Sequence, residues 1–373
     1  MPHGKKKILY AFEFAHDDAM WNDVLEAAQR LAPGRVEAGG FGGIFRGYGP
    51  GASLRRIANM IWMHAAIPFK ILASKPDLVF ARTTPPMMQI SCAFWARLLG
   101  AKSAVWLMDY HPVFGQRSSA GAAARAAWSL FSWLDRALLK TNAAVICLDR
   151  AMERTVLERE PQAKTRTVPT WGLEDAQWSD MGRPDGDSVR LIYSGNFGKA
   201  HSAGRLKKFL KALSARKKTV LCYCGNSAHA ESAFREIASE CGTGFESFPR
   251  VEKFSQLGGL YREKEIDYGI VVLDDLFAGL VSPSKFSGYA SFGLPIIDIG
   301  PRGTNSNMAC SEMGAGIAVE DDEAAEAAAE AAADPKVQRE CAAATRAAAE
   351  YFSKDRAGDV AKILLGAAGC GDA

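Results

Sequence analysis

The stretch Val189-Arg190-Leu191-Ile192-Tyr193-Ser194-Gly195-Asn196-Phe197-Gly198-Lys199 decides the fold, because a short apolar run leads directly into a glycine-bearing loop. The residues after the loop have helical spacing, so the stretch predicts a strand, a tight loop and a helix. Glycines let backbone amides approach a ligand closely, and a helix N-terminus attracts anions such as a diphosphate. The loop is therefore a candidate binding site, although it matches neither a Walker sequence nor a dinucleotide fingerprint.

The same alternation of β-branched runs and helical patterns extends through both halves of the chain. It predicts an α/β protein with two Rossmann-like, doubly wound parallel-sheet domains. The predicted strands are Lys7–Phe12, Leu78–Ala81, Ala104–Met108, Ala144–Leu148 and Thr165–Val168 in the first half, and Val189–Tyr193, Thr219–Cys224, Gly244–Phe248, Tyr268–Leu273, Pro295–Ile299 and Gly316–Val319 in the second.

A length of 373 residues suits two domains, each with its own core. A polar stretch with no apolar period follows Pro169-Thr170-Trp171-Gly172, as expected of a linker. We therefore predict an N-terminal domain over 1–172, a linker over 173–188 and a C-terminal domain over 189–350. A last helix in 351–373 is expected to cross back to the N-terminal domain.

The composition excludes several classes of protein. With 48% apolar residues and 45 Lys+Arg against 42 Asp+Glu, the chain is neither disordered nor collagen-like. The 8 cysteines include no Cys-x-x-Cys pair, which argues against a zinc or redox framework and favours a reducing compartment. No window of about 18 uninterrupted apolar residues occurs, so no membrane span is expected and the protein is predicted to be cytoplasmic.

Two stretches of the first half, Leu54–Leu72 and Ala122–Leu139, are unusually apolar and mix aromatic with basic residues. An interfacial helix pairs these residue types in this way. Core helices of a Rossmann-like domain have a similar composition. Peripheral contact with the inner face of a membrane and ordinary core packing are thus both open.

Polar residues follow several predicted strands, where ligands bind in an open parallel sheet. In Ser282-Pro283-Ser284-Lys285, either serine can cap a helix and Lys285 adds a cation where phosphate oxygens would arrive. In the first half, Asp109-Tyr110-His111 can bind sugar hydroxyls or orient a proton of an acceptor. Thr83-Thr84 places two hydroxyls at the same edge, and nothing in the chain suggests metal or acyl chemistry.

These segments resemble the retaining GT-B glycosyltransferases of family four, in particular the bacterial branch that builds surface polysaccharides. The matching segments occur in the family's order over about residues 5–365: Pro76–Ala81 with Thr83–Pro86, Asp109–Pro112, Val168–Trp171, Tyr193–Gly198, and Pro283–Lys285 with Gly293–Ile297.

The resemblance implies metal-independent transfer, with retention, of a sugar from a UDP- or GDP-linked donor to a glycan or lipid-linked acceptor, in a cleft between the domains. No other cofactor and no nucleic acid are implied. Together the loops and the resemblance give catalytic candidates at Asp109, His111 and Lys285, acceptor-binding candidates at Thr83, Thr84 and Tyr110, and donor-binding candidates at Ser194, Gly195, Asn196, Gly198, Lys199, Arg250, Val251, Pro283, Ser284 and Lys285.

Two positions depart from the family pattern. Gly288 stands where the family has the glutamate that binds the donor ribose, and Leu280 stands where the earlier acid of the pair falls. Asp274, Asp275 and Asp298 are candidates to compensate. The alternative is a catalytically silent GT-B protein that acts as a ligand-binding scaffold or partner subunit. A sugar-nucleotide epimerase of the same architecture is a third hypothesis.

Overall fold

The structure, a computed structural model, describes residues 5–13, 18–45, 52–118, 121–172, 177–182, 186–195, 197–198, 200–201 and 203–370. The chain forms two units: unit 1 comprises Met1–Pro169, Gly279–Val281 and Asp355–Ala373, and unit 2 comprises Thr170–Ala278 and Ser282–Lys354. The predicted domain ends at 172 and 350 lie within a few residues of these bounds, whereas the predicted linker over 173–188 falls inside unit 2. The predicted boundaries also did not include the return of Gly279–Val281 to unit 1.

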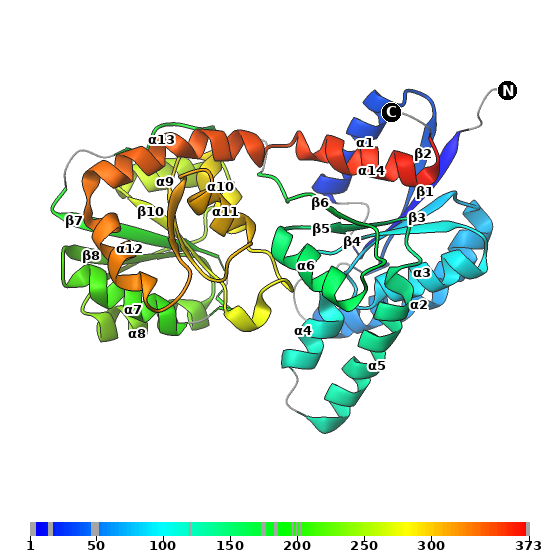
Figure 1. Cartoon of the computed structure of the whole chain (residues 1–373), viewed down its shortest axis with the longest axis horizontal. Helices are drawn as coiled ribbons and strands as arrows, with labels where there is room; N and C mark the ends of the chain where they lie inside the picture. Colours follow the sequence, from blue (N-terminus) through cyan, green and yellow to red (C-terminus); the bar gives the residue numbers. More distant parts are fainter. Residues whose placement is uncertain are drawn as a thin grey trace. The chain divides into compact units, whose positions relative to one another are not determined.

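Unit 1 contains a six-stranded parallel sheet in the order β2-β1-β3-β4-β5-β6. Figure 1 shows helices flanking it. The strands are β1 (Lys6–Ala11), β2 (Val36–Phe41), β3 (Leu78–Arg82), β4 (Lys102–Trp106), β5 (Ala144–Cys147) and β6 (Thr165–Thr167). The helices are α1 (Ala19–Leu31), α2 (Ala52–Ser74), α3 (Met88–Leu98), α4 (His111–Ser118), α5 (Ala122–Leu139), α6 (Arg150–Arg159) and α14 (Arg356–Ala368).

Unit 2 contains a second six-stranded parallel sheet, in the order β12-β11-β10-β7-β8-β9. Its strands are β7 (Ser188–Ser194), β8 (Lys218–Cys224), β9 (Gly244–Phe248), β10 (Tyr268–Val272), β11 (Ile296–Ile299) and β12 (Gly316–Val319). Its helices are α7 (Ala203–Ser214), α8 (Ala228–Cys241), α9 (Gln256–Glu263), η1 (Asp275–Phe277), α10 (Lys285–Ser291), α11 (Asn305–Ser311), α12 (Ala324–Ala333) and α13 (Pro335–Tyr351). The predicted fold class of two doubly wound parallel sheets is confirmed.

Burial on both faces explains why the sheets were predictable. Residues 78–81 of β3 and all of β10 are buried without alternation, as expected of strands that helices cover on both sides. In unit 2 the two faces of the sheet contribute to two separate apolar clusters, one including Tyr193 and Phe234 and the other including Phe286 and Phe292. Each unit therefore has its own core.

The strand order of each sheet reverses once. In unit 1 the reversal lies between β1 and β3, and in unit 2 it lies between β7 and β10. In open parallel sheets, ligands bind outside the carboxyl ends of the strands at such a reversal point. These two places are therefore where each unit should be searched for a site.

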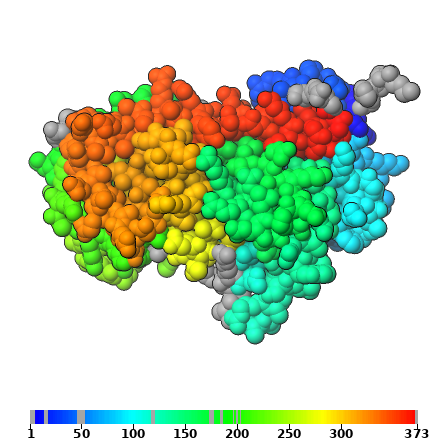
Figure 2. All heavy atoms as spheres, in the orientation of Figure 1, coloured from blue at the N-terminus to red at the C-terminus, as the bar shows by residue number. Residues whose placement is uncertain are grey.

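The last helix, α14, belongs to unit 1 and packs against α1. Leu365 and Cys370 form a small apolar cluster with Ala32, and the surface of α14 adjoins that of the N-terminal segments in Figure 2. The expected return of a C-terminal helix to the N-terminal domain is confirmed.

Helix α2 is more apolar than a count of uninterrupted residues indicates. By length and mean hydropathy alone, Ser53–Ser74 is long and apolar enough to cross a membrane, and 28% of its most apolar window is buried in the protein. The expectation that no segment spans a membrane stays a prediction, because length and mean hydropathy alone do not decide it. The buried face of α2, with Met63, Ile67 and Ile71, packs into the core of unit 1.

Candidate functional site

In unit 2, the loop after β7 lies at the reversal point of the sheet. Ser194 ends the strand, and its backbone N–H donates to the Tyr289 hydroxyl at 2.9 Å. Gly195 has a φ of 107°, which favours glycine, and its N–H donates to the Cys224 carbonyl at 2.9 Å. The chain thus turns sharply at the strand end, as the glycine-bearing loop predicts.

Lys285 begins α10 beside this turn. Its Nζ lies 4.7 Å from the centroid of the Tyr193 ring, and a Cβ built on Gly195 would be 3.4 Å from its Cε. Any side chain at position 195 would therefore press on the lysine stem. Lys285 and the turn at Gly195 therefore lie close together within unit 2.

Lys285 carries an uncompensated charge. Among the residues that the structure describes, no carboxylate forms an ion pair with it. Burial lowers the pKa of its ammonium group from 10.5 to about 8. The ammonium group is partly removed from water, and its described neighbour is the aromatic face of Tyr193. Such a cation is suited to bind an anion, because a phosphate would restore its charged form.

His201 lies on the same loop and remains neutral at pH 7. Burial, and secondarily the Lys285 charge, lower the pKa of its imidazole to about 4. The Gly198 N–H donates to its Nδ1 at 3.0 Å, and its ring stacks on Phe197 with centroids 5.1 Å apart. His201 therefore holds the loop rather than adding charge. The predicted residues Asn196 and Lys199 lie outside the described residues.

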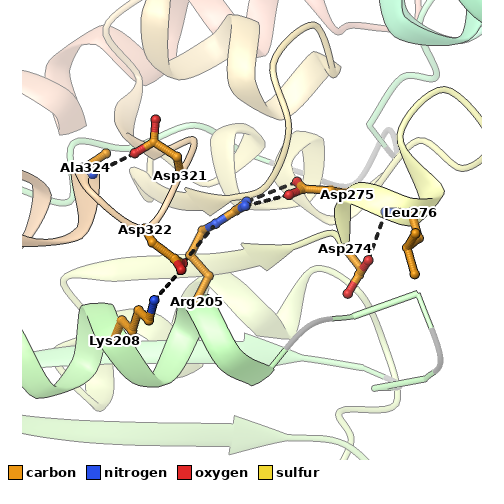
Figure 3. Close-up of polar contacts among 8 residues, drawn as sticks. All are labelled: Arg205, Lys208, Asp274, Asp275, Leu276, Asp321, Asp322 and Ala324. Carbon is orange, nitrogen blue, oxygen red and sulfur yellow. Dashed lines mark hydrogen bonds and ion pairs between the residues drawn. The ribbon is translucent and has the colours of Figure 1, made fainter.

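A charged cluster occupies the rim near the ends of β10 and β11 (Figure 3). Arg205 of α7 donates to both carboxylate oxygens of Asp275, at 3.2 and 2.7 Å, and lies 3.8 Å from Asp322. Lys208 pairs with Asp322, and a hollow of about 360 Å³ lies among these side chains. The two cations are neutralised locally, so among the described residues of this region Lys285 is the cation without a carboxylate partner.

Two of the candidates to replace the ribose-binding glutamate are already engaged. Asp275 is held by Arg205, and the Asp274 carboxylate accepts from the Leu276 N–H at 2.9 Å. The Asp274 N–H donates to the Ala200 carbonyl at 2.8 Å, which joins the loops after β10 and β7. The third candidate, Asp298, is 1% exposed, and burial raises the pKa of its carboxyl to about 7.

Gly288 lies where a side chain would meet an aromatic ring. A Cβ at this position would be 3.2 Å from Cζ of Phe254, which is tighter than ordinary contact. Leu280 is fully buried in unit 1, and its carbonyl accepts from the Tyr110 N–H at 2.7 Å. The two positions that carry acids in the resembling family are thus filled here by apolar packing.

The other donor candidates lie at varied places in unit 2. Ser284 is exposed and makes no side-chain cap bond to α10, so the predicted cap is wrong for that residue, and Pro283 is half-buried beside it. Arg250 is exposed and follows β9, as does Val251, and β8 separates that strand from β7. The sheet order therefore groups Ser194, Gly195 and Lys285 more closely than Arg250.

In unit 1, the predicted acceptor residue Tyr110 is an interior residue. Its side chain is fully buried, its hydroxyl donates to Asp135 at 2.8 Å, and Arg159 donates to it at 3.0 Å. Burial raises its pKa well above the ordinary value. This differs from the expected role, because the hydroxyl is committed to a buried network.

Thr83 and Asp109 form a structural turn. The Thr83 hydroxyl, also fully buried, accepts from the N–H groups of Met108 and Asp109 at 3.2 and 3.3 Å. Asp109 forms an antiparallel bridge with Val281. His111 begins α4, and burial lowers the pKa of its imidazole while Asp109 opposes that shift. Asp109 and His111 are thus together at the end of β4, as predicted.

Sequence reasoning missed a polar cluster at the β1/β3 reversal point. Asp18 caps α1 and accepts from Arg82, at the end of β3, at 2.5 Å, and from the Tyr10 hydroxyl. The Glu13 N–H donates to the carbonyl of the predicted residue Thr84 at 3.1 Å. The Glu13 carboxylate in turn accepts from Asn59 of α2 at 3.3 Å. An Asp before a helical pattern is the one signal that the sequence offers.

Several solved structures share the fold of the whole chain. Anabaena HepE in complex with UDP and glucose matches with a TM-score of 0.63 at 11% identity, over 97% of this chain and 99% of that chain. WaaG, a glycosyltransferase involved in lipopolysaccharide biosynthesis, matches with a TM-score of 0.64 at 13% identity, over 96% and 100%. WaaB, a lipopolysaccharide outer core galactosyltransferase, matches with a TM-score of 0.60 at 11% identity, over 97% and 98%.

No protein-family model matches the sequence, and no curated protein matches it. At these identities the structural likeness shows the fold alone, which is the two-domain GT-B fold. The activity has to be argued from this chain's own residues.

Proposed function

We propose that the protein is a glycosyltransferase that moves a sugar from a nucleotide-sugar donor to a glycan or lipid-linked acceptor in polysaccharide biosynthesis. The observation that carries the proposal is Lys285, a half-buried cation without a described carboxylate partner, next to the Gly195 turn at the reversal point of unit 2. HepE has the same fold and was crystallised with UDP and with UDP-glucose, which supports a nucleotide-sugar ligand here.

The proposed reaction is metal-independent and retains the anomeric configuration. A nucleoside diphosphate leaving group develops negative charge as the glycosidic bond breaks, and a preorganised cation stabilises that charge. Lys285 would supply the counter-charge without a divalent ion, and its neutral neighbour His201 would not compete for the phosphate. In unit 1, His111 and Asp109 would orient the acceptor hydroxyl at the end of β4.

The donor test is a thermal-shift panel of UDP-, GDP- and dTDP-sugars, followed by product analysis with and without EDTA. Stabilisation by at least one donor, and a transferred sugar with retained configuration by NMR, are expected. Protection by none of the donors would contradict the proposal. Lys285→Ala should abolish the donor shift, whereas the exposed Lys211→Ala on α7 of the same unit should keep it.

We also propose that the protein acts at the inner face of the membrane through α2, α3 and α5. These helices are neighbours in unit 1 and expose Leu54, Ile57, Ile61, Trp62, Phe69, Leu72, Phe94, Leu98, Leu130, Phe131 and Trp133. Helices α2 and α3 contain no acidic residue, and the single acid of α5, Asp135, is buried. Exposed apolar side chains among arginines favour anionic lipid.

Co-sedimentation with phosphatidylcholine vesicles, with and without phosphatidylglycerol, tests this placement. Binding should require the anionic lipid and should weaken in Trp133→Ser, whose side chain is 65% exposed. Leu276→Ser in unit 2 is the matched control, because Leu276 is also 65% exposed and lies outside the three helices. Equal losses in both variants would argue against the proposed membrane face.

A catalytically silent scaffold is the second candidate, and the packing of Phe254 against Gly288 favours it. The ribose contact of the resembling family cannot form in its usual manner there. Donor binding without hydrolysis or transfer over a broad panel of acceptors would favour the scaffold, and any sugar transfer would exclude it. Release of an altered sugar nucleotide in the absence of an acceptor would indicate the epimerase instead.

A further inference from the structure

Unit 1 has a large hollow at the edge of its sheet opposite the predicted site. About 990 Å³ in volume, it lies at the N-terminal ends of β4, β5 and β6, between those strands, the end of α3 and α14. The candidate site residues of unit 1 follow the carboxyl ends of β3 and β4 instead. The surface of α14 adjoins that of the segment around β6 in Figure 2.

The lining of this hollow has one sign of charge. Five of its residues are cations, and none of its residues is acidic: Arg97, Lys102, Lys164, Arg166 and Lys362. All five side chains are exposed. The hydroxyl-bearing residues Ser103, Thr141 and Thr165 also line it.

Little of this charge is neutralised by the protein. Within the described part of the chain, none of the five cations forms an ion pair with a carboxylate. Lys102 donates to the Ala367 carbonyl at 3.0 Å, and Arg166 donates to the neighbouring Thr165 carbonyl at 2.7 Å. Both of these partners are neutral backbone groups. Lys102 also interacts electrostatically with the Asp77 carboxylate, but that carboxylate is paired with Lys6, so most of the positive charge of the hollow is not offset by described residues.

Helix ends explain only part of the arrangement. Arg97 lies in the last turn of α3, and Lys102 meets the last turn of α14, where cations suit the helix dipole. Lys164 directly precedes the edge strand β6 and Arg166 lies within it, whereas Lys362 lies in the middle of α14. The helix dipole therefore does not explain why these three cations, from β6 and α14, lie around the same hollow.

We propose that this hollow binds a compact polyanion that carries two or more phosphate groups, either free in solution or as the headgroup of a lipid. Five cations around one hollow match several negative charges at once, and arginine forks and lysine ammonium groups both bind phosphate oxygens. The volume exceeds that of a single phosphate. The binding site is distinct from the proposed donor site, because it lies in the other unit and does not include Lys285.

The test uses the full-length protein and inorganic tripolyphosphate in isothermal titration calorimetry. Wild type should bind two equivalents, one at the Lys285 site and one at this hollow. Lys164→Ala/Arg166→Ala should lose the second equivalent, with affinity lowered at least tenfold, while UDP binding stays unchanged. Lys285→Met should lose the other equivalent and keep this one, so the two sites fail independently.

Controls guard against unfolding and identify the source of the phosphate. Lys362→Glu, on a different element, should also abolish the second equivalent, and melting temperatures of both variants should match wild type because the side chains are exposed. Binding should weaken between 50 and 200 mM salt. Vesicles containing cardiolipin, whose headgroup carries two phosphates, should bind through the same residues if the source is lipid, and should not if it is soluble. Tripolyphosphate binding that is unchanged in both Lys164→Ala/Arg166→Ala and Lys362→Glu would overturn the proposal, whereas a single equivalent that these variants lose and Lys285→Met keeps would count only against the Lys285 site.

Discussion

The charge of Lys285 is expected to favour ligand binding but to lower the stability of the ligand-free protein. Burial of its ammonium group lowers the pKa from 10.5 to about 8. Because a change of one pKa unit corresponds to about 1.4 kcal/mol, keeping this lysine charged in the folded protein costs up to about 3 kcal/mol at pH 7. Replacing it with methionine should therefore stabilise the ligand-free protein while abolishing the binding of nucleoside diphosphates.

The sign of the pH dependence follows from the same pKa. Between pH 8 and 10.5 the unfolded chain binds more protons at this lysine than the folded protein does. The lysine's contribution to the free energy of unfolding should accordingly rise with pH across this window. In Lys285→Met that rise should be absent, whereas Lys211→Met, at an exposed lysine of α7, should keep it.

Two measurements check this reasoning. Thermal unfolding at pH 7 and pH 10 should show a higher melting temperature for Lys285→Met at pH 7 and a smaller gain on raising the pH. Calorimetry of UDP binding at pH 8, in buffers of different ionisation enthalpy, should show uptake of about half a proton by wild type, since a phosphate restores the charged lysine. A less stable Lys285→Met protein, or UDP binding without proton uptake, would refute the reasoning.

Three further predictions concern the framework around the sites. Gly100 and Gly293 have φ values of 78° and 79°, but of the two only Gly293 has a backbone atom close by: the Ser179 carbonyl oxygen lies 1.7 Å from a Cβ built there. In thermal unfolding, Gly100→Ala should lower the free energy of unfolding by about 1 kcal/mol, and Gly293→Ala should lower it several times more. Burial raises the pKa of the Asp135 carboxyl from 3.8 to about 6, so the folded protein holds this proton to a higher pH than the unfolded chain does. The free energy of unfolding should therefore fall as the pH rises from about 4 to about 6, and the melting temperature of Asp135→Asn should change less over this range. Tyr110→Phe should lower the free energy of unfolding by about 1–3 kcal/mol and leave the KM for the acceptor unchanged, whereas a raised KM with unchanged stability would restore its predicted acceptor role.

The strands were predictable where helices cover both faces, because burial then requires a continuous apolar run. Residues 78–81 and β10 meet that condition. Strand β2 was missed for the opposite reason. Its sequence Val-Glu-Ala-Gly-Gly-Phe has one β-branched residue and two glycines, and it lies at an edge of the sheet, where only one neighbouring strand constrains it.

The candidate site was predictable only as far as local patterns reach. The position of Lys285 was predictable, because the local sequence indicates a helix start after a strand. Its lack of a described carboxylate partner was not, because that depends on which side chains the neighbouring loops place around it. Tyr110 was misplaced because its partner Asp135 is 25 residues away along the chain. The Asp18–Arg82 pair was missed because its members become neighbours only when β1 pairs with β3.

The charges at the two reversal points support the proposal that the two units bind different ligands. In unit 1, Arg82 is paired with Asp18, and the nearby Glu13 is bonded to Asn59, so among these described residues carboxylates outnumber cations. A phosphate would be repelled at such a place, whereas the hydroxyls of a sugar could bind to it. In unit 2, Lys285 adds a positive charge that no described carboxylate offsets. The assignment of the diphosphate to unit 2 therefore rests on this chain's own charges as well as on the family resemblance, and Arg82→Met should leave UDP affinity unchanged where Lys285→Met removes it.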